Sequence, residues 1–200
     1  MSKEPKEQAA KPAVFLLDNH MVQYFLSKDI SPHIQFILDE IEKTGSELAI
    51  SQVVVYESLK AIIFNEDKFN DVKDFLENSI IRYPVSEEVL LESARVHELY
   101  GSDNDAKNRR NGISTEDIII ATTSMLLGSY VITCDANDFP MPFFKEVHRE
   151  FVYYERKSQR KHLVIYILQP DTEAVEAGLN KLSPPKMTKK KAKTKAKAKK

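Results

Sequence analysis

Four carboxylates occupy positions in the sequence from which they could act together chemically. They are Asp18, Glu57, Asp117 and Asp135. Carboxylate oxygens are hard ligands that suit Mg²⁺ or Mn²⁺, whereas a site for zinc or copper would favour histidine or cysteine at these positions. Carboxylates that share a small space repel one another unless a cation offsets their charge. A shared metal site is the simplest reason for them to meet, and such a site can orient a phosphodiester and activate water.

Two of these acids lie within two residues of the ends of predicted strands. Asp18 comes after the apolar run 13–17, which is typical of a buried strand. Asp135 lies two residues beyond a strand predicted at 130–133. In an open α/β sheet the ligand site lies beyond the carboxyl ends of the strands. Both acids are therefore expected at that edge.

The other two acids belong to predicted helices. Asp117 is in the first turn of a helix expected over 114–127. Glu57 lies in a helix that follows a short strand at 48–50. Helical side chains lean towards the N-terminus of their helix, so the Glu57 carboxylate can reach back to the same edge.

Strands and helices alternate along the chain, which predicts an α/β layered domain with a mainly parallel sheet. Further apolar patterns predict helices near 21–26, 32–43, 67–78 and 86–100. They also predict β segments at 151–155 and 162–168. The exposed apolar helix faces near 24–41 would suit a homodimer.

Composition agrees with one globular domain, since 42% of the 200 residues are apolar. The single cysteine, Cys134, excludes an internal disulfide framework and favours the cytosol. The N-terminus has no signal-peptide core, and no stretch approaches the roughly 20 apolar residues of a membrane helix. We therefore expect a cytoplasmic protein that has no membrane segment.

The charge is distributed unevenly. The net charge is −1, but residues 186–200 hold nine lysines and no acid, so residues 1–185 carry −1 − 9 = −10. These features predict a flexible arm at 1–12, a folded domain at 13–169 and a disordered, lysine-rich tail at 170–200. The tail either binds an anionic partner such as RNA or solubilises the chain.

Four motifs, taken in order, resemble the signatures of PIN domains. They are Phe-Leu-Leu-Asp at 15–18, Ile-Ser-Gln-Val-Val-Val-Tyr-Glu at 50–57, Asp-Ile-Ile-Ile-Ala-Thr at 117–122 and Val-Ile-Thr-Cys-Asp-Ala-Asn-Asp-Phe at 131–139. The resemblance covers about residues 13–150 and includes VapC-type toxins. It implies a three-layer α/β/α fold and a metal-dependent ribonuclease in which the motif acids hold Mg²⁺ or Mn²⁺. It also implies RNA as substrate and an antitoxin protein as partner.

Each acid also has a purely structural interpretation when it is taken singly. Asp18 would end a strand, Asp117 would cap a helix together with Ser114, and Glu57 would be a surface charge. The combination favours a shared site. Asp138 is a secondary candidate ligand, because an Asp in an Asn-Asp-Phe-Pro loop often only stabilises a turn. In the family the first Asp is usually followed by a small hydroxyl residue and then by Asn or Ser, whereas Asn19 and His20 follow Asp18 here, and His20 is expected to alter substrate contact.

The leading hypothesis is thus a metal-dependent endoribonuclease, which would be the toxin half of a toxin–antitoxin pair. The main alternative is a noncatalytic PIN-fold module that binds RNA or a ribonucleoprotein, and a third is a nuclease that cuts DNA at the same site. Retention of every motif acid disfavours the binding module, because a scaffold has no physical need for clustered carboxylates.

Overall fold

A six-stranded mixed sheet forms the centre of the molecule. The computed structural model describes residues 12–60, 62–78, 80–103 and 112–182. The strand order is β3-β2-β1-β4-β6-β5. The first four of these strands run parallel, and β6 runs antiparallel to both of its neighbours, β4 and β5. Their bounds are β1 Val14–Leu17, β2 Glu47–Ser51, β3 Ile81–Tyr83, β4 Tyr130–Thr133, β5 Phe144–Arg156 and β6 Gln159–Pro170.

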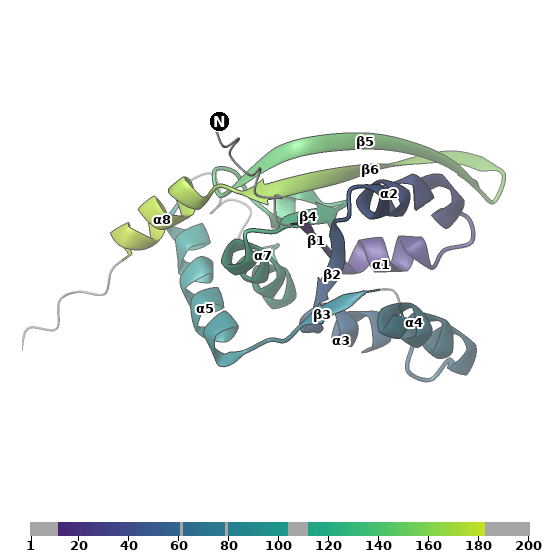
Figure 1. Ribbon diagram of the computed structural model, residues 1–200, viewed down its shortest axis with the longest axis horizontal. Helices are drawn as coiled ribbons and strands as arrows, with labels where there is room; N and C mark the ends of the chain where they lie inside the picture. The colour runs from purple at the N-terminus through teal and green to yellow at the C-terminus, as the bar shows by residue number, and fades with distance from the viewer. Residues whose placement is uncertain (1–11, 61, 79, 104–111, 183–200) are drawn as a thin grey trace, which may run out of the picture.

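Helices cover both faces of the sheet, so the predicted three-layer α/β/α arrangement is confirmed. In Figure 1, α1 to α4 lie on one side of the central strands and α5 and α7 lie on the other. The bounds are α1 Asn19–Phe25, α2 Ser31–Lys43, α3 Gln52–Lys60, α4 Glu66–Asn78, α5 Glu87–Ser102, α7 Thr115–Leu127 and α8 Thr172–Lys181. None of the helices in these described ranges is long and apolar enough to cross a membrane.

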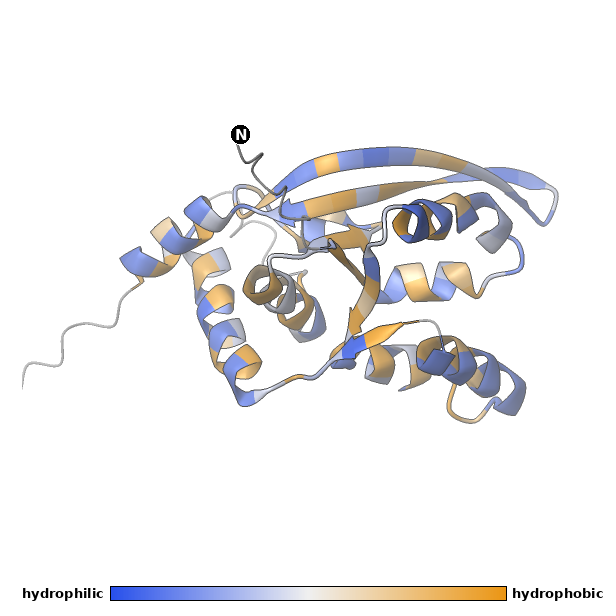
Figure 2. Ribbon diagram, viewed as in Figure 1, coloured by the Kyte–Doolittle hydropathy of each residue, from blue (hydrophilic) through white to orange (hydrophobic). Residues whose placement is uncertain are grey.

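Burial follows the pattern expected for parallel strands between two helical layers. Leu16 and Leu17 of β1 are completely buried. Parallel strands covered on both faces need apolar side chains on both. Figure 2 shows β2 as apolar and the outer helix α4 as largely polar. This burial fixes the positions of the carboxyl ends of β1 and β4, which Asp18 and Asp135 follow.

Helix α7 begins and ends where its sequence predicts. Ser114 is the N-cap and accepts a hydrogen bond from the Asp117 backbone, while Gly128 follows the last turn with a φ of 62°. Glycine adopts this left-handed conformation without the steric cost that a Cβ would add. Residues 118–124 are all buried, so the helix is enclosed on every side. The first turn of α7 is consequently fixed at the sheet edge.

The apolar residues of α2 do not form an exposed face, so the basis of the homodimer expectation is wrong. Ile34, Ile37 and Ile41 are buried in the main core of the same chain. The apolar stripe of an amphipathic helix normally packs onto its own sheet, and here it does. Among the apolar side chains of α2, Phe36 is the exposed one, at 42%.

The prediction of disorder over 170–200 is also wrong for its first part, which forms helix α8. Asp171 caps this helix by accepting a hydrogen bond from the Ala174 backbone. Val175 is buried, and Gly178 lies so close to the Leu99 side chain that a Cβ at that position would clash. The helix is short and has few apolar residues, so its sequence carries a weak signal. The predicted arm at 1–12, apart from residue 12, and the lysines at 186–200 lie outside the described residues.

The two β segments expected near the C-terminus form one long hairpin. Strands β5 and β6 pair without interruption except for a bulge between Glu146 and His148. Both strands are longer than the sequence pattern predicts, because many of the added positions are charged and exposed. Apolar alternation marks only the part of a strand that packs on a core.

Candidate metal centre

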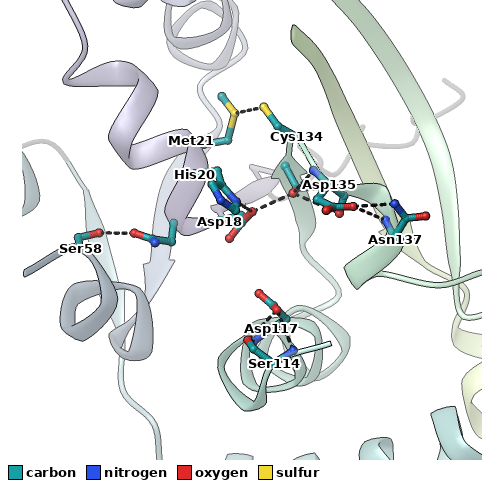
Figure 3. A network of polar contacts seen from close by, with 11 residues as sticks. Asp18, His20, Met21, Ser58, Ser114, Asp117, Cys134, Asp135 and Asn137 are labelled. Carbon is teal, nitrogen blue, oxygen red and sulfur yellow. Dashed lines mark hydrogen bonds and ion pairs between the residues drawn. The ribbon is translucent and has the colours of Figure 1, made fainter. Parts of the chain in front are cut away.

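Asp18 sits at the end of β1 and is almost completely buried, at 2% exposure. Its backbone N–H donates to the carbonyl of Ile132 in β4, 3.1 Å away, which holds it beside the neighbouring strand. Its carboxylate accepts a hydrogen bond from the Thr133 hydroxyl at 2.9 Å. The same hydroxyl accepts from the Asp135 backbone N–H at 3.0 Å. Thr133 therefore links the two acids that follow the two central strands. Figure 3 shows these two acids, Asp18 and Asp135, near one another.

A short 3₁₀ turn, η1 Ala136–Asp138, carries the acids that follow β4. The carboxylate of Asp135 accepts two hydrogen bonds from Asn137, one from its backbone and one from its side chain, at 3.0 and 2.9 Å. These bonds keep the turn closed. The turn brings Asp138, three residues further on, back to the same edge of the sheet.

Asp117 reaches this edge from α7. One of its carboxylate oxygens accepts from the Ser114 backbone at 3.1 Å and from the Ser114 hydroxyl at 2.6 Å. This is the capping box that the structural interpretation of Asp117 predicts, and it is confirmed. Capping does not remove the residue from the site, because Figure 3 shows its carboxylate pointing from the helix towards Asp18. The cap instead fixes the direction of the side chain.

Glu57 approaches from α3, and its side chain is only 14% exposed. The ammonium group of Lys60 lies 3.6 Å from Glu57 and 3.6 Å from Glu116 at the start of α7. A hydrogen bond of 2.9 Å from Ser58 to the Asn19 side chain ties α3 to α1. Glu57 is therefore held next to the other acids, and Lys60 lies beside it.

These acids, which we call the carboxylate cluster, affect one another electrostatically; they are Asp18, Glu57, Asp117, Asp135 and Asp138. Burial raises the pKa of Asp117, and the charge of Asp18 raises it further against the hydrogen bonds from Ser114. Burial and the charge of Asp117 raise the pKa of Glu57. Burial, followed by the charges of three neighbouring cluster acids, raises the pKa of Asp138 to about 7. Such mutual destabilisation calls for a cation.

His20 lies at the mouth of the cluster, with a side chain that is 61% exposed. Its Nδ1 is 3.5 Å from the Asp18 carboxylate. That contact, aided by the charges of Asp138 and Asp117, raises the pKa of His20 to about 9 although partial burial opposes the shift. The imidazole is therefore cationic at neutral pH in the absence of metal.

Comparison with known families now identifies the fold. The family model described as "PIN domain" matches residues 15–141. The chain belongs to the PIN domain family. The matched region contains all members of the carboxylate cluster. PIN domains are generally nucleases and typically use divalent metals.

Two solved structures are similar to this PIN domain. One is VapBC2 from Rickettsia felis bound to a DNA fragment from its promoter, with 16% identity and a TM-score of 0.48 over 63% of this chain and 90% of that chain. The other is FitAcB from Neisseria gonorrhoeae, with 23% identity and a TM-score of 0.47 over 62% of this chain and 90% of that chain. Among curated proteins, none matches this chain.

The donor set of this PIN domain suits a hard divalent cation, because it consists of carboxylate oxygens. In their present positions, no three His, Cys, Asp or Glu side chains of the described residues lie close enough together to hold a metal ion. Like charges keep their distance when no cation offsets them. A bound ion would therefore have to draw the carboxylates of the cluster inward.

Two hydroxyl residues position these acids, although the motifs in the sequence did not mark either as part of the site. Thr133 bridges Asp18 and Asp135, and Ser114 holds Asp117. The Thr-x-Asp spacing within 131–139 was a usable signal for the first, because a threonine two residues before an acid can accept from its backbone. The bond from Thr133 to Asp18 had no local signal, since it joins residues that lie 115 apart in sequence.

The metal-free chain is expected to lose stability as pH rises from about 4 to about 9. The pKa of Asp138 is raised from 3.8 to about 7, so the folded chain binds more protons than the unfolded chain between these values. Its stability therefore falls through that interval. The contribution of His20 is fully present below 6.5 and is lost as pH rises through about 9. Both groups act in the same direction, and thermal unfolding in EDTA measures their sum.

The variant Asp138→Asn should flatten this pH dependence. It removes one repelling charge, so the midpoint of unfolding should rise by roughly 3–6 °C at about pH 8, after allowance for solvent screening. Asp171→Asn is the control, because the pKa of Asp171 is lowered by Lys145 and its titration lies below this range. An Asp138→Asn chain with the same pH slope as the wild type would contradict the prediction.

Proposed function

We propose that this PIN domain is a metal-dependent endoribonuclease, and that the carboxylate cluster holds Mg²⁺ or Mn²⁺. The observation that carries the proposal is that five acids from four segments of the chain lie at one sheet edge, where the pKa values of Glu57, Asp117 and Asp138 are raised, that of Asp138 to about 7. Such an arrangement costs folding stability in the absence of a cation. A bound metal ion would offset this cost, which explains why the five acids lie together.

We assign ligand roles to Asp18, Glu57, Asp117 and Asp135, with Asp138 as a further ligand. An ion bound there would supply activation of water and neutralisation of charge on the attacked phosphodiester. The chain's own residues prepare for it. Thr133 and Ser114 fix the directions of the carboxylates by hydrogen bonds, and near-complete burial of Asp18 excludes bulk water from that ligand.

Two cations at the rim suit an RNA phosphate. The exposed imidazole of His20 is protonated at neutral pH, because its pKa is raised to about 9 by Asp18. The ammonium group of Lys60, which is 45% exposed, lies 3.6 Å from both Glu57 and Glu116. We propose that these groups contact phosphates beside the scissile bond. RNA as the substrate rests on the resemblance of the four motifs to ribonucleases of this family.

The deciding experiment uses the full chain with several structured and single-stranded RNAs, each with Mn²⁺, with Mg²⁺ or with EDTA. We expect cleavage only when the metal is present, and recovery when Mn²⁺ is restored after EDTA. Cleavage that persists in EDTA would exclude the proposed mechanism. No cleavage of any RNA, with RNA still bound, would favour the noncatalytic binding module. Cleavage of DNA and not RNA would point to the third hypothesis.

We also propose an antitoxin-like protein that blocks the carboxylate cluster. The support is the resemblance of the motifs to VapC-type toxins. The product of an adjacent small reading frame would be co-purified with the chain and added to the cleavage reaction. Inhibition at a one-to-one ratio is expected, and unchanged cleavage in the presence of that protein would contradict this part of the proposal.

A further inference from the structure

The β5–β6 hairpin extends well past the strand that supports it. Thr133, the last residue of β4, pairs with Tyr166 of β6. The residues of β6 from Gln159 to Ile165 precede that point, and β6 runs antiparallel to β4. They therefore project beyond the carboxyl end of β4 by about 23 Å at the usual rise of a strand. In Figure 1 the hairpin arches over α2 on that side.

One face of this hairpin packs on the domain. Val152, Leu163 and Ile165 point inward and are at most 7% exposed. Near the tip, Arg156 lies 3.8 Å from Asp29 in the connection between α1 and α2. The hairpin is therefore held along its length rather than projecting freely into solvent.

The other face carries aromatic rings and basic side chains, and we call it the hairpin platform. Directly opposed residues of an antiparallel pair share a face, and four such pairs make up the platform: Arg149 with Tyr166, Phe151 with Val164, Tyr153 with His162, and Arg160 with Glu155. Phe151 and Tyr153 are 52% and 54% exposed. Exposed apolar side chains that adjoin one another on a surface are a feature of binding surfaces, whereas singly scattered ones are not.

Cations lie directly over the rings of the platform. The guanidinium carbon of Arg160 is 4.9 Å from the centre of the Tyr153 ring, and that of Arg149 is 5.1 Å from the centre of Tyr166. Arg149 also pairs with Glu146. The tip, residues 155–162, holds four Lys or Arg residues, one histidine and one acid, whereas residues 1–185 together carry −10. A polyanion is thus attracted to this part of an otherwise acidic domain.

We propose that the hairpin platform binds single-stranded RNA and leads it to the carboxylate cluster. Aromatic faces stack unpaired bases, and arginines nearby contact phosphates or add cation–π attraction. The platform begins at Tyr166, whose partner Thr133 donates a hydrogen bond to Asp18. Its near end therefore lies next to the cluster on the same face of the sheet. This inference rests on the proposed function in that it takes RNA as the ligand.

Binding is measured on the full chain by fluorescence anisotropy with a labelled single-stranded oligoribonucleotide in EDTA, where cleavage does not interfere. Tyr153→Ala should weaken binding at least about fivefold and the double variant Phe151→Ala/Tyr153→Ala by more, because each stacked base is lost. Tyr153→Phe keeps the ring and should bind like the wild type. Phe64→Ala, which removes a fully exposed ring between α3 and α4, should also leave binding unchanged.

Circular dichroism melting of each variant separates a loss of binding from a loss of folding, since these rings are also cross-strand partners. A folded double variant that binds the RNA within twofold of the wild type would overturn the inference. The inference would also be overturned if a duplex of the same sequence competed for the chain as well as the single strand does. The same holds if a platform variant changed the oligomeric mass in light scattering but not the affinity for RNA. A chain that binds RNA through the platform but cuts none would refute the proposed nuclease and leave this inference standing.

Discussion

Replacing Asp18 with asparagine should lower RNA cleavage by more than about 100-fold. Changes to groups that only orient metal ligands typically cost 10–100-fold, so the loss of a charged ligand should exceed that range. Asparagine has almost the same shape and can still accept the hydrogen bond from Thr133, which lies 2.9 Å from the native carboxylate. The fold should therefore survive. The initial rate of RNA cleavage with Mn²⁺ is the measurement.

Asp39→Asn provides a matched control. Asp39 is an exposed carboxylate on α2 that accepts a long hydrogen bond, 3.4 Å, from the Gln35 side chain. The same chemical change at that position should leave the cleavage rate within about twofold of the wild type, as is usual for surface substitutions. An Asp18→Asn chain that is folded and fully active would rule out Asp18 as a ligand.

Replacing Thr133 with valine should lower cleavage by about 10–100-fold, because Thr133 positions two proposed ligands. Valine keeps the shape of the side chain but removes the hydroxyl, which donates to Asp18 and accepts from the Asp135 backbone. Both of those groups then lose a partner in a buried place, which costs about 1–3 kcal/mol of folding stability. The half-saturating Mn²⁺ concentration should rise as well, an effect that a purely structural threonine would not produce.

Two further variants separate positioning from packing. Thr133→Ser keeps the hydroxyl and should retain most of the activity and the Mn²⁺ dependence. Thr123→Val removes a buried hydroxyl of α7 that donates only to the Ile119 carbonyl, 2.7 Å away, so the metal dependence should not change. If Thr133→Val shows a lower melting temperature but an unchanged Mn²⁺ requirement, the residue is structural only.

The electrostatics of the cluster explain why a cation affects both folding and activity in these predictions. In the metal-free chain, His20 stands 3.5 Å from Asp18 and carries a positive charge at neutral pH because its pKa is raised to about 9. The His20 imidazolium offsets part of the negative charge of the carboxylate cluster, which a bound divalent ion would also neutralise. It cannot offset all of it, since the pKa of Asp138 is still raised to about 7.

Asp117 illustrates how structural and functional interpretations of one residue coexist. The sequence supports both a helix cap with Ser114 and a place in a metal site. The cap is present in the structure, with a 2.6 Å hydrogen bond from the Ser114 hydroxyl. The same bonds aim the carboxylate at Asp18 (Figure 3), so capping positions the proposed ligand.

The sequence by itself determined the order of the central strands and helices and the placement of the motif acids at their ends. Apolar runs mark β1 and β4 as buried strands, and capping residues mark the bounds of α7. These signals are local, because burial pattern and backbone capping depend on residues within a few positions of one another. The carboxyl ends of parallel strands then meet at one edge, which brings Asp18 and Asp135 together.

Only the tertiary structure decided the features that depend on distant partners. The bond from Thr133 to Asp18 joins residues 115 apart, and the packing of α8 depends on Leu99 in another helix. The long exposed half of the β5–β6 hairpin, with Arg160 over Tyr153, lacks the apolar alternation that marks a buried strand. Contacts of this kind form when the sheet and its layers assemble, so residues within a few positions along the chain do not specify them.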